Sequence, residues 1–303
     1  TEQHPDEEED DALWQVDIET KSTKELLSLK GWRLRQPQFS PDGNVLAYTG
    51  QQTDAPAFRQ WQIGLASLKK DVVSNYYWLT DASTLDRSVQ RFQWLDGREA
   101  LIFNCASKGG YPLLLASFGL IKPAELIGPA DGLPRGVHSF ASGGGVIIYS
   151  LTTWENPSTL RIRRGEEDKQ IFNPNAWINT RAVSQPSQYQ INVEDRVIDY
   201  WLMPPTQQNQ SENQTFKVPV VLEIHGGPSA MWGPGERTMW FEFQLLCSYG
   251  YAVVYANPRG SGGYGESFQR GNYQDWGDGP SRDVLASLDS ALADNAWLDA
   301  DRQ

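Results

Sequence analysis

Short apolar runs separated by polar turns fill the chain up to residue 184, and their layout recurs three times. Each unit has a turn followed at once by an apolar strand, and the turns lie at Asp42, Asp96 and Gly144. A second strand follows in each unit, within RQWQIGLAS, YPLLLAS and STLRIRR. A period of about 50 residues with four short strands per unit is typical of β-propeller blades. An irregular all-β domain is the alternative.

The number of such units is small for a closed ring. Residues 11–29 resemble the last strands of a preceding blade, so we expect about three to four blades in residues 1–184. Closed propellers have about four to eight blades, and an open ring leaves strand edges free to pair. The sequence therefore predicts a partial β-propeller that is completed by chain outside these residues, unless the blade count is wrong.

The hydrophobic pattern changes near Gln185. Residues 185–205 predict a hairpin that turns at Glu194, and a polar stretch over 206–217 predicts a loop. The buried strand VPVVLEI, a helix over 237–249 closed by Gly250 and the strand YAVVYAN follow. A last helix begins with Pro280 as its first residue and Asp283 in its first turn. Alternating strands and helices predict a second, α/β domain over residues 185–303.

Composition and charge narrow the function classes. The 303 residues are 39% hydrophobic and 21% charged, which is typical of globular protein. A formal charge of −12 argues against binding to nucleic acid or anionic lipid. No apolar run reaches the roughly 18 residues of a membrane span. Cys105 and Cys247 both lie in apolar surroundings, so we expect two buried free thiols. The compartment is not determined by these features, and the cytoplasm is our default expectation.

The first candidate site is the segment VVLEIHGGPSAMWGPG, in which a buried strand ends on His225, Gly226 and Gly227. Ligands of open α/β sheets bind beyond the carboxyl ends of the strands. Because glycine has no side chain, a ligand can approach the backbone there, and an N–H that points toward the ligand can stabilise a developing oxyanion. An ordinary strand-to-loop turn is the alternative. We expect His225 to brace the loop by hydrogen bonds rather than to act as a base.

A second glycine-rich segment, NPRGSGGYGESF, matches the dinucleotide pattern G-x-G-x-x-G from Gly260 to Gly265. Pro258 and Arg259 separate these glycines from the preceding strand, which weakens the match. The acidic residues about 20 positions on also lie at the start of a helix and not at a strand end. Nucleotide binding is therefore the weaker hypothesis.

No catalytic centre is complete within the sequence. The serine elbow pattern G-x-S-x-G is absent, and the histidines are His4, His138 and His225. No C-x-x-C or H-E-x-x-H pattern indicates a metal site, and no cofactor is expected.

Taken together, HGGPSAMWGPG, GYAVVYANPRGSGGYGESF and DWGDGPSRDVLASLDSAL resemble the prolyl oligopeptidase family of serine peptidases. The similarity is strongest to its acylaminoacyl-peptidase and dipeptidyl-peptidase-like branch. FSPDG-x-x-LAY and NAWINTRAVSQPSQYQI also match the family, in its propeller and in the strand that returns to its hydrolase domain. The resemblance covers most of the chain.

The resemblance implies a β-propeller followed by an α/β-hydrolase domain that cleaves short peptides through a serine acyl-enzyme. The family places the serine elbow about ten residues beyond WLDADRQ, so this chain would hold the amino-terminal half of the catalytic domain and no triad residue. The missing remainder of that domain is then a required partner, and a homo-oligomer stays open. By itself the chain would be inactive.

The family also implies roles for single residues. Gly227 matches the position whose N–H donates to the oxyanion, Gly226 precedes it, and His225 is a structural brace in the acylaminoacyl-like branch. Asn257 and Arg259 match a loop beside the active site, as scaffold that adjoins the substrate. Glu166 and Glu167 could imitate the amino-terminus clamp of dipeptidyl peptidases, although a solvated turn is the simpler interpretation.

Two other functions stay open. One is an esterase on the same scaffold, and the other is a propeller-based binding module with a degenerate hydrolase domain. The preference between acylaminoacyl, dipeptidyl and internal peptide bonds is not predicted.

Overall fold

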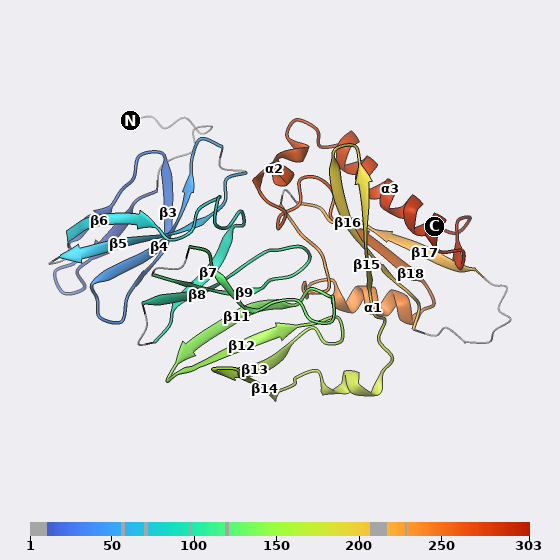
Figure 1. The fold of residues 1–303 in the computed structure, drawn as a ribbon, viewed down its shortest axis with the longest axis horizontal. Coiled ribbons are helices and arrows are strands. Elements are labelled where there is room, and N and C mark those ends of the chain that lie inside the picture. Colours follow the sequence, from blue (N-terminus) through green and yellow to red (C-terminus); the bar gives the residue numbers. More distant parts are fainter. Residues whose placement is uncertain are drawn as a thin grey trace. The chain divides into compact units, whose positions relative to one another are not determined.

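The computed structural model describes residues 11–55, 58–69, 72–96, 99–118, 121–206, 217–227 and 229–303. Gly97 of the second predicted turn, most of the polar loop (207–216), His4 and Pro228 lie outside the described residues. Strands dominate the amino-terminal part of the chain, and helices occur in the carboxyl-terminal part (Figure 1).

Three four-stranded sheets follow one another, and in each the strands are neighbours in chain order. Every pairing in these sheets whose register is described is antiparallel. The strands are β3 (Trp32–Phe39), β4 (Val45–Gln52), β5 (Gln62–Lys69) and β6 (Val72–Trp78); β7 (Val89–Trp94), β8 (Ala100–Cys105), β9 (Leu113–Ser117) and β10 (Ala124–Ile127); β11 (Gly136–Gly143), β12 (Val146–Thr152), β13 (Thr159–Arg164) and β14 (Glu167–Phe172).

The predicted turns and second strands fall where the sequence indicates. Gly43 (φ 74°) lies between β3 and β4, and Gly144 (φ 59°) lies between β11 and β12. The second strands are β5, β9 and β13. Residues 11–29 form a separate two-stranded sheet of β1 (Leu13–Val16) and β2 (Thr23–Leu27). Meandering four-stranded sheets are typical of propeller blades.

The carboxyl-terminal part contains a five-stranded sheet in the order β15-β16-β18-β17-β19. β15 and β16 form the predicted hairpin, β16 pairs antiparallel with β18, and β17 is parallel to both β18 and β19. The elements are β15 (Ser187–Val193), β16 (Arg196–Met203), β17 (Val218–Glu223), α1 (Trp240–Ser248), β18 (Ala252–Ala256), α2 (Glu266–Gln269), α3 (Asp278–Asp294) and β19 (Leu298–Asp299), with 3-10 turns at Ala176–Thr180 and Arg270–Asn272.

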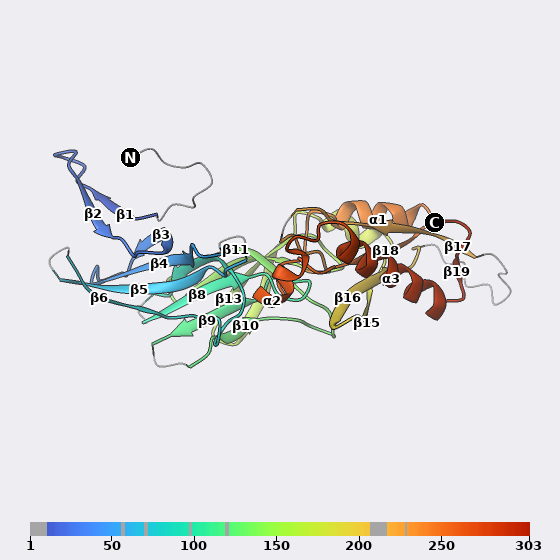
Figure 2. The same cartoon turned by 90° about the horizontal axis from the view of Figure 1, so that it is seen from above.

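The central strand β18 is apolar on both sides because helices cover both faces of the sheet there (Figure 2). Val254 and Ala256 of β18 pack with Leu288 and Ala291 of α3. On the opposite face, where side chains alternate, Tyr255 packs with residues of α1. This explains why YAVVYAN is a continuous apolar run.

The boundaries of the two long helices differ from the predictions. α1 begins at Trp240 and not at residue 237. α3 begins at Asp278, so Pro280 is its third residue and Asp283 lies in its second turn; both predicted placements were wrong. The N-cap residue is Gly277, which makes no side-chain cap bond. The Asp275 carboxylate before it accepts a hydrogen bond from the Gly279 N–H of the first turn at 3.1 Å, a contact that the pattern did not reveal.

The chain divides into two compact units. One comprises residues 1–105, 114–126 and 142–145, and the other comprises 106–113, 127–141 and 146–303. The second unit holds the five-stranded sheet and also the loops 106–113 and 127–141. The predicted boundary near residue 185 stays a prediction. Among the described residues, no helix is both long and apolar enough to cross a membrane.

Both cysteines are buried and unpaired, as the sequence predicts. Burial raises the pKa of the Cys105 thiol to about 12 and that of Cys247 to about 11. The two residues therefore act as small apolar side chains in two separate cores.

Candidate functional site

The candidate site lies where β17 and β18 end side by side. Glu223 of β17 is level with Tyr255 of β18, so the segments that leave the two strands meet at one edge of the sheet. The chain passes from β17 to β18 on one side and then returns past β17 to β19 on the other. Such a change of direction opens a crevice at the carboxyl ends of parallel strands, which is where open α/β sheets bind their ligands.

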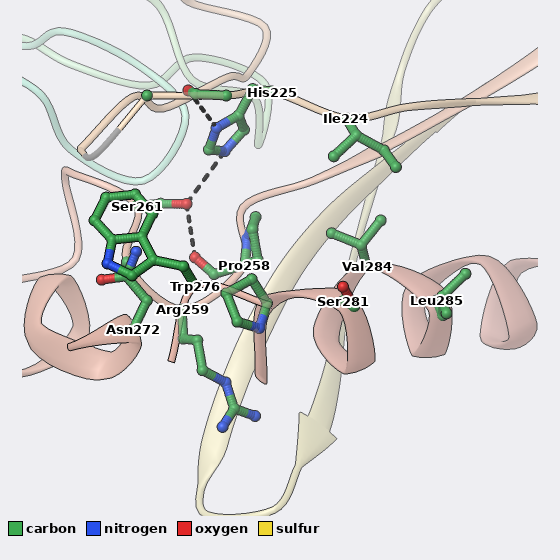
Figure 3. A pocket seen from close by; sticks show the side chains of 14 residues that line it. Ile224, His225, Pro258, Arg259, Ser261, Asn272, Trp276, Ser281, Val284 and Leu285 are labelled. Atoms are coloured by element: carbon green, nitrogen blue, oxygen red, sulfur yellow. Dashed lines mark hydrogen bonds between the residues drawn. The ribbon is translucent and has the colours of Figure 1, made fainter. Parts of the chain in front are cut away.

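A pocket of about 360 Å³ occupies this edge (Figure 3). Its walls come from the loop after β17, the loop after β18 and the first turns of α3, namely Ile224, His225, Gly226, Gly227, Pro258, Arg259, Gly260, Ser261, Asn272, Trp276, Pro280, Ser281, Val284 and Leu285. The glycines and the apolar side chains therefore face one cavity.

Gly226 and Gly227 form a loop with little packing around it. Gly227 has φ 78°, a left-handed conformation that favours glycine, and a Cβ added there would have the Ala230 methyl as its nearest neighbour, at 3.8 Å. A Cβ added at Gly226 would meet no heavy atom of the described residues within 4 Å. Among the described residues, the Gly227 N–H donates no hydrogen bond. Its role as an oxyanion donor stays a prediction.

His225 is held by polar contacts at Nε2 and by packing of its ring. Nε2 lies 3.1 Å from Asn257 Oδ1 and 3.2 Å from Ser261 Oγ, while Nδ1 lies 3.4 Å from the Gly226 carbonyl oxygen. The ring also packs edge-on against Trp232 at 5.4 Å between centroids. Burial lowers the pKa of His225, although the bonds to Gly226 and Asn257 act in the opposite direction. A neutral, packed imidazole agrees with the brace that we expect.

The contact between His225 and Ser261 joins a histidine and a serine 36 positions apart, and sequence reasoning missed it. The pair resembles a nucleophile and its base, but His225 carries a hydrogen on the nitrogen that faces Ser261 and cannot accept one there. Asn257 Oδ1 can only accept, so the His225 Nε2 beside it carries the hydrogen. The Ser261 hydroxyl donates to the Pro258 carbonyl at 2.7 Å (Figure 3). His225 therefore cannot take the proton of Ser261 in this arrangement.

Asn257 lies behind the pocket and is fully buried. It does not line the cavity, although the residues that follow it do. Its side chain contacts the loop after β17 at His225 and at Trp232. The structure thus brings Asn257 together with the glycine loop, as the scaffold prediction requires, but holds its side chain away from the cavity.

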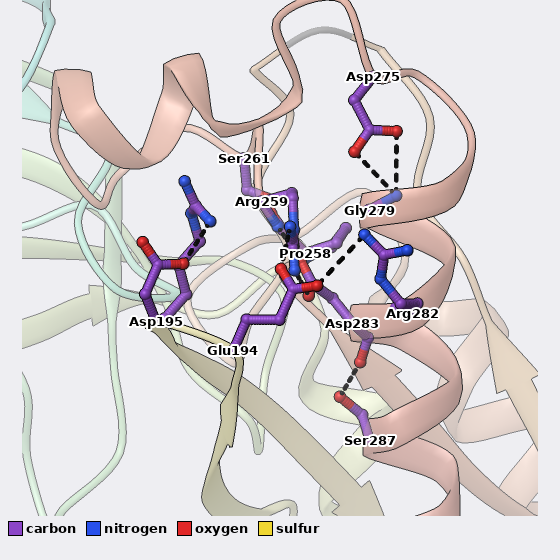
Figure 4. Close-up of polar contacts among 11 residues, drawn as sticks. Glu194, Asp195, Pro258, Arg259, Ser261, Asp275, Gly279, Arg282, Asp283 and Ser287 are labelled. Atoms are coloured by element: carbon purple, nitrogen blue, oxygen red, sulfur yellow. Dashed lines mark hydrogen bonds and ion pairs between the residues drawn. The ribbon is translucent and has the colours of Figure 1, made fainter.

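Arg259 is clamped by two acidic residues (Figure 4). Its guanidinium donates to both carboxylate oxygens of Asp283, at 2.9 and 2.7 Å, and to Glu194 at 2.8 Å. The Arg259 side chain is 4% exposed and that of Asp283 is 0% exposed. These hydrogen bonds to carboxylates raise the pKa of Arg259 further above its usual range. The guanidinium contacts the hairpin and α3, and the position of Arg259 next to the substrate stays a prediction.

Beyond Trp232 the loop passes close to two other segments of the same compact unit. The Gly235 N–H donates to the Gly109 carbonyl at 2.9 Å, and its own carbonyl oxygen lies 2.9 Å from His138 Nε2. A Cβ at Gly233 would lie 2.2 Å from the Gly109 Cα. A Cβ at Gly136 would lie 2.0 Å from the Gly235 oxygen. These contacts, here called the glycine seam, require residues without side chains, and nothing periodic in the sequence marks them.

The G-x-G-x-x-G segment is explained by packing. A Cβ at Gly260 would lie 2.4 Å from the Asn272 side chain, and one at Gly262 would lie 2.6 Å from the Ser229 carbonyl oxygen. Gly265 precedes the four-residue α2, which is too short to be a phosphate-binding helix of the dinucleotide type.

The remaining candidates lie away from this pocket. Glu166 is 99% exposed at the turn between β13 and β14 and forms an ion pair with Arg163 at 3.3 Å. Glu167 is also exposed, at the start of β14. These positions agree with the solvated-turn interpretation. Within the described part of the chain, no group of three or more His, Cys, Asp or Glu side chains could hold a metal ion.

Comparison with known proteins identifies related sequences. Residues 237–303 match the family model described as "Prolyl oligopeptidase family", which confirms the resemblance. The "uncharacterized peptidase YuxL" of Bacillus subtilis (strain 168) is 39% identical over 158 residues, which is 51% of this chain and 23% of that protein. "Dipeptidyl-peptidase 5" of Trichophyton schoenleinii is 25% identical over 269 residues, which is 88% of this chain and 36% of that protein.

Solved structures show the same fold at low identity. An acylaminoacyl peptidase in complex with Z-Gly-Gly-Phe-chloromethyl ketone aligns with a TM-score of 0.65 at 18% identity, over 95% of this chain and 60% of that one. Dipeptidyl peptidase 4 of Porphyromonas gingivalis aligns with a TM-score of 0.64 at 16% identity, over 95% of this chain and 40% of that one. The chain spans 23% and 36% of the lengths of the two curated relatives.

Proposed function

Residues 237–303 carry the sequence of the prolyl oligopeptidase family, and from this premise we propose that the complete protein is a serine peptidase. Its substrates are short peptides, which it cleaves through a serine acyl-enzyme. The residues described above supply the loop that binds the oxyanion, and the triad comes from the remainder of the catalytic domain.

One observation carries this proposal. The Gly227 N–H lies at the carboxyl end of a buried parallel strand, lines the pocket and donates to no other group among the described residues. A fixed backbone donor beside a cavity can stabilise the negative charge that develops on a carbonyl oxygen during acyl transfer.

The pairing of β19 supports the location of the nucleophile. β19 runs parallel to β17, with Leu298 level with Val218 and Asp299 level with Pro219. After β19 the chain turns at Ala300 and Asp301, and the Arg302 carbonyl then accepts a hydrogen bond from the Val220 N–H at 3.0 Å. A strand that continues from Arg302 beside β17 would run toward Gly226 and Gly227. A serine elbow at its carboxyl end would therefore face the pocket, as the proposal requires.

The same proposal extends to the architecture. We interpret the three four-stranded sheets as blades of a partial propeller in residues 1–184, with β1 and β2 closing a further blade. Residues 185–303 are then the amino-terminal half of an α/β-hydrolase domain. The low-identity structures support this fold, and the names of the relatives favour an acylaminoacyl or dipeptidyl substrate without deciding between them.

The first test is covalent labelling of the complete protein with a fluorophosphonate, followed by peptide mapping. We expect one labelled serine in a G-x-S-x-G segment and turnover of short peptide anilides. Turnover of acyl esters alone would identify an esterase on the same scaffold. Neither labelling nor turnover would identify a non-catalytic binding module and reject the peptidase proposal.

A second test concerns Gly227 itself. Gly227→Pro removes the amide hydrogen and conflicts with φ 78°, so kcat should fall about 10²–10³-fold in the complete protein. Gly226→Ala is the matched control, because its Cβ meets no heavy atom within 4 Å in the part of the chain that the structure describes. Equal losses in both variants would show that the loop is generally sensitive and that the Gly227 amide has no special role.

A further inference from the structure

Asn257 is the polar side chain that closes the glycine loop at both ends. It is 0% exposed at the end of β18, yet all of its hydrogen-bonding capacity is used. Oδ1 accepts from the Trp232 N–H at 2.9 Å and from His225 Nε2 at 3.1 Å. Nδ2 donates to the Trp232 carbonyl at 2.7 Å and to the Tyr264 hydroxyl at 3.0 Å. An asparagine amide can make four such bonds, and here all four are formed.

The two residues that Asn257 holds are the ends of the loop. His225 directly precedes Gly226, and Trp232 follows five residues after Gly227. The bonds to both the N–H and the carbonyl of Trp232 imitate a backbone pairing, so they fix this end of the loop in position and in rotation. The bond to His225 Nε2 fixes the other end.

Few other contacts set the direction of the Gly227 amide. Among the described residues, nothing within 4 Å would touch a Cβ at Gly226, and only the Ala230 methyl comes near one at Gly227. The interior of the loop is held by the Gly262 N–H, which donates to the Ala230 carbonyl at 3.1 Å. Gln269 also donates to the Ser229 hydroxyl at 2.8 Å. The glycines themselves are therefore oriented from the loop ends.

We propose that Asn257 is a positioning residue, which aims the Gly227 N–H at the oxyanion by holding His225 and Trp232. It acts from behind the pocket wall and does not touch the substrate, since it does not line the cavity. This role rests on the proposed function and deepens it by naming the group that pre-organises the oxyanion loop. Such a residue should influence kcat and leave substrate binding nearly unchanged.

The test uses the complete protein and the variants Asn257→Ala and Asn257→Asp. Because a small misplacement of a catalytic group can cost about 10²-fold, we expect Asn257→Ala to lower kcat by roughly that factor, with KM within about threefold. Fluorophosphonate labelling should slow in parallel. Ser287→Ala is the control, since it removes an equally buried polar group whose hydroxyl donates only within α3, to the Asp283 carbonyl. It should leave kcat within about threefold.

Asn257→Asp allows a second measurement, the pH dependence of activity, which a purely structural role of Asn257 would not change. The carboxylate keeps the acceptor for Trp232 and His225 but loses both donors, whereas the protonated acid regains one O–H donor. The activity of this variant relative to wild type should therefore rise as the pH falls. This variant also serves if Asn257→Ala does not fold.

The outcomes separate the two proposals. An inactive, unlabelled wild type would reject the proposed function and this role with it. An active wild type whose Asn257→Ala variant keeps its kcat, or whose Asn257→Asp variant shows the wild-type pH profile, would overturn the positioning role alone. A loss confined to KM would mean that Asn257 shapes substrate binding, and this also contradicts the proposal.

Discussion

At the scale of single residues, hydrogen-bond polarity decides what a contact can do. Ser261 and His225 lie at 3.2 Å, yet the Ser261 proton is directed to the Pro258 carbonyl and the His225 hydrogen to Asn257. A search for serine and histidine at short distance would select this pair as a catalytic dyad. The partners of each group show that it belongs to the scaffold of the loop.

We therefore predict that Ser261→Ala keeps the nucleophile intact. The complete protein with this substitution should be labelled by a fluorophosphonate to the same extent as wild type, because Ser261 contributes no reactive oxygen. Peptide mapping of the labelled serine checks this directly. Label on Ser261, or its loss in the variant, would assign the nucleophile to this chain and reverse the argument.

Glu223 shows a second effect at the scale of single residues, because burial disfavours the charged form of its carboxyl group. Burial and, to a lesser degree, the nearby Glu242 raise the pKa of Glu223. A raised carboxyl pKa means that the folded state disfavours the charged form. The free energy of unfolding should therefore fall as the pH rises from the unfolded-state pKa to the raised folded-state pKa, and stay constant above it.

Glu223→Gln should remove this fall, so the variant should be more stable than wild type at neutral pH and gain nothing at acidic pH. Urea unfolding at a series of pH values measures the difference. Glu242→Gln should reproduce a smaller part of the gain, because burial is the larger cause of the shift. A stability difference that is independent of pH would contradict the assignment.

At the scale of helices and strands, Arg259 and its two acidic partners connect three segments of the fold. Arg259 follows β18, Asp283 lies on α3 and Glu194 turns the hairpin between β15 and β16. Asp283 also accepts the backbone N–H of Arg259 at 2.8 Å. The pair thus fixes the loop after β18, which forms one wall of the pocket, to the helix and the hairpin.

Asp283→Ala should destabilise this sheet by about 3–5 kcal/mol, because it leaves the Arg259 charge buried without its main partner. Arg282→Ala is the matched control on the same helix. It breaks an exposed pair with Glu194 at 3.3 Å and should cost only about 0–1 kcal/mol. Urea unfolding of the complete protein measures both, and similar losses in the two variants would argue against a special role for burial.

At the scale of the whole molecule, the local pattern accounts for more of the fold than of the site. Turn residues followed at once by apolar runs predict β4, β8 and β12, and a continuous apolar run predicts β18. These are short-range signals that the chain carries within each element. The start of α3 was misplaced because its first turn is bonded to Asp275, which lies outside the helical pattern.

The site is harder to predict because its contacts join distant positions. Gly226 and Gly227 stand out as glycines at the end of an apolar strand. The bonds from Asn257 to Trp232 span 25 positions, and the glycine seam joins Gly109 with Gly235. Such partners are brought together only by the sheet order, which no local pattern encodes.

The glycine seam gives a prediction at this scale. Gly136→Ala would place a Cβ 2.0 Å from the Gly235 oxygen, so the backbones must separate and stability should fall by about 1–3 kcal/mol. Gly143→Ala at the other end of β11 is the control, because its Cβ would have an ordinary contact at 3.7 Å. Thermal unfolding of both variants checks this. Equal midpoint temperatures would show that the backbones of the glycine seam can separate without loss of stability.

The crossover from β17 through α1 to β18 also sets an order of events during folding. The loop after β17 is synthesised before Asn257, the residue that holds its two ends, because Asn257 comes 30 residues later than Gly227. Contacts that close long loops form late, and this one needs the neighbouring strand already in place. In a refolding experiment with the complete protein, we therefore expect the proposed peptidase activity to recover later than the secondary structure measured by circular dichroism.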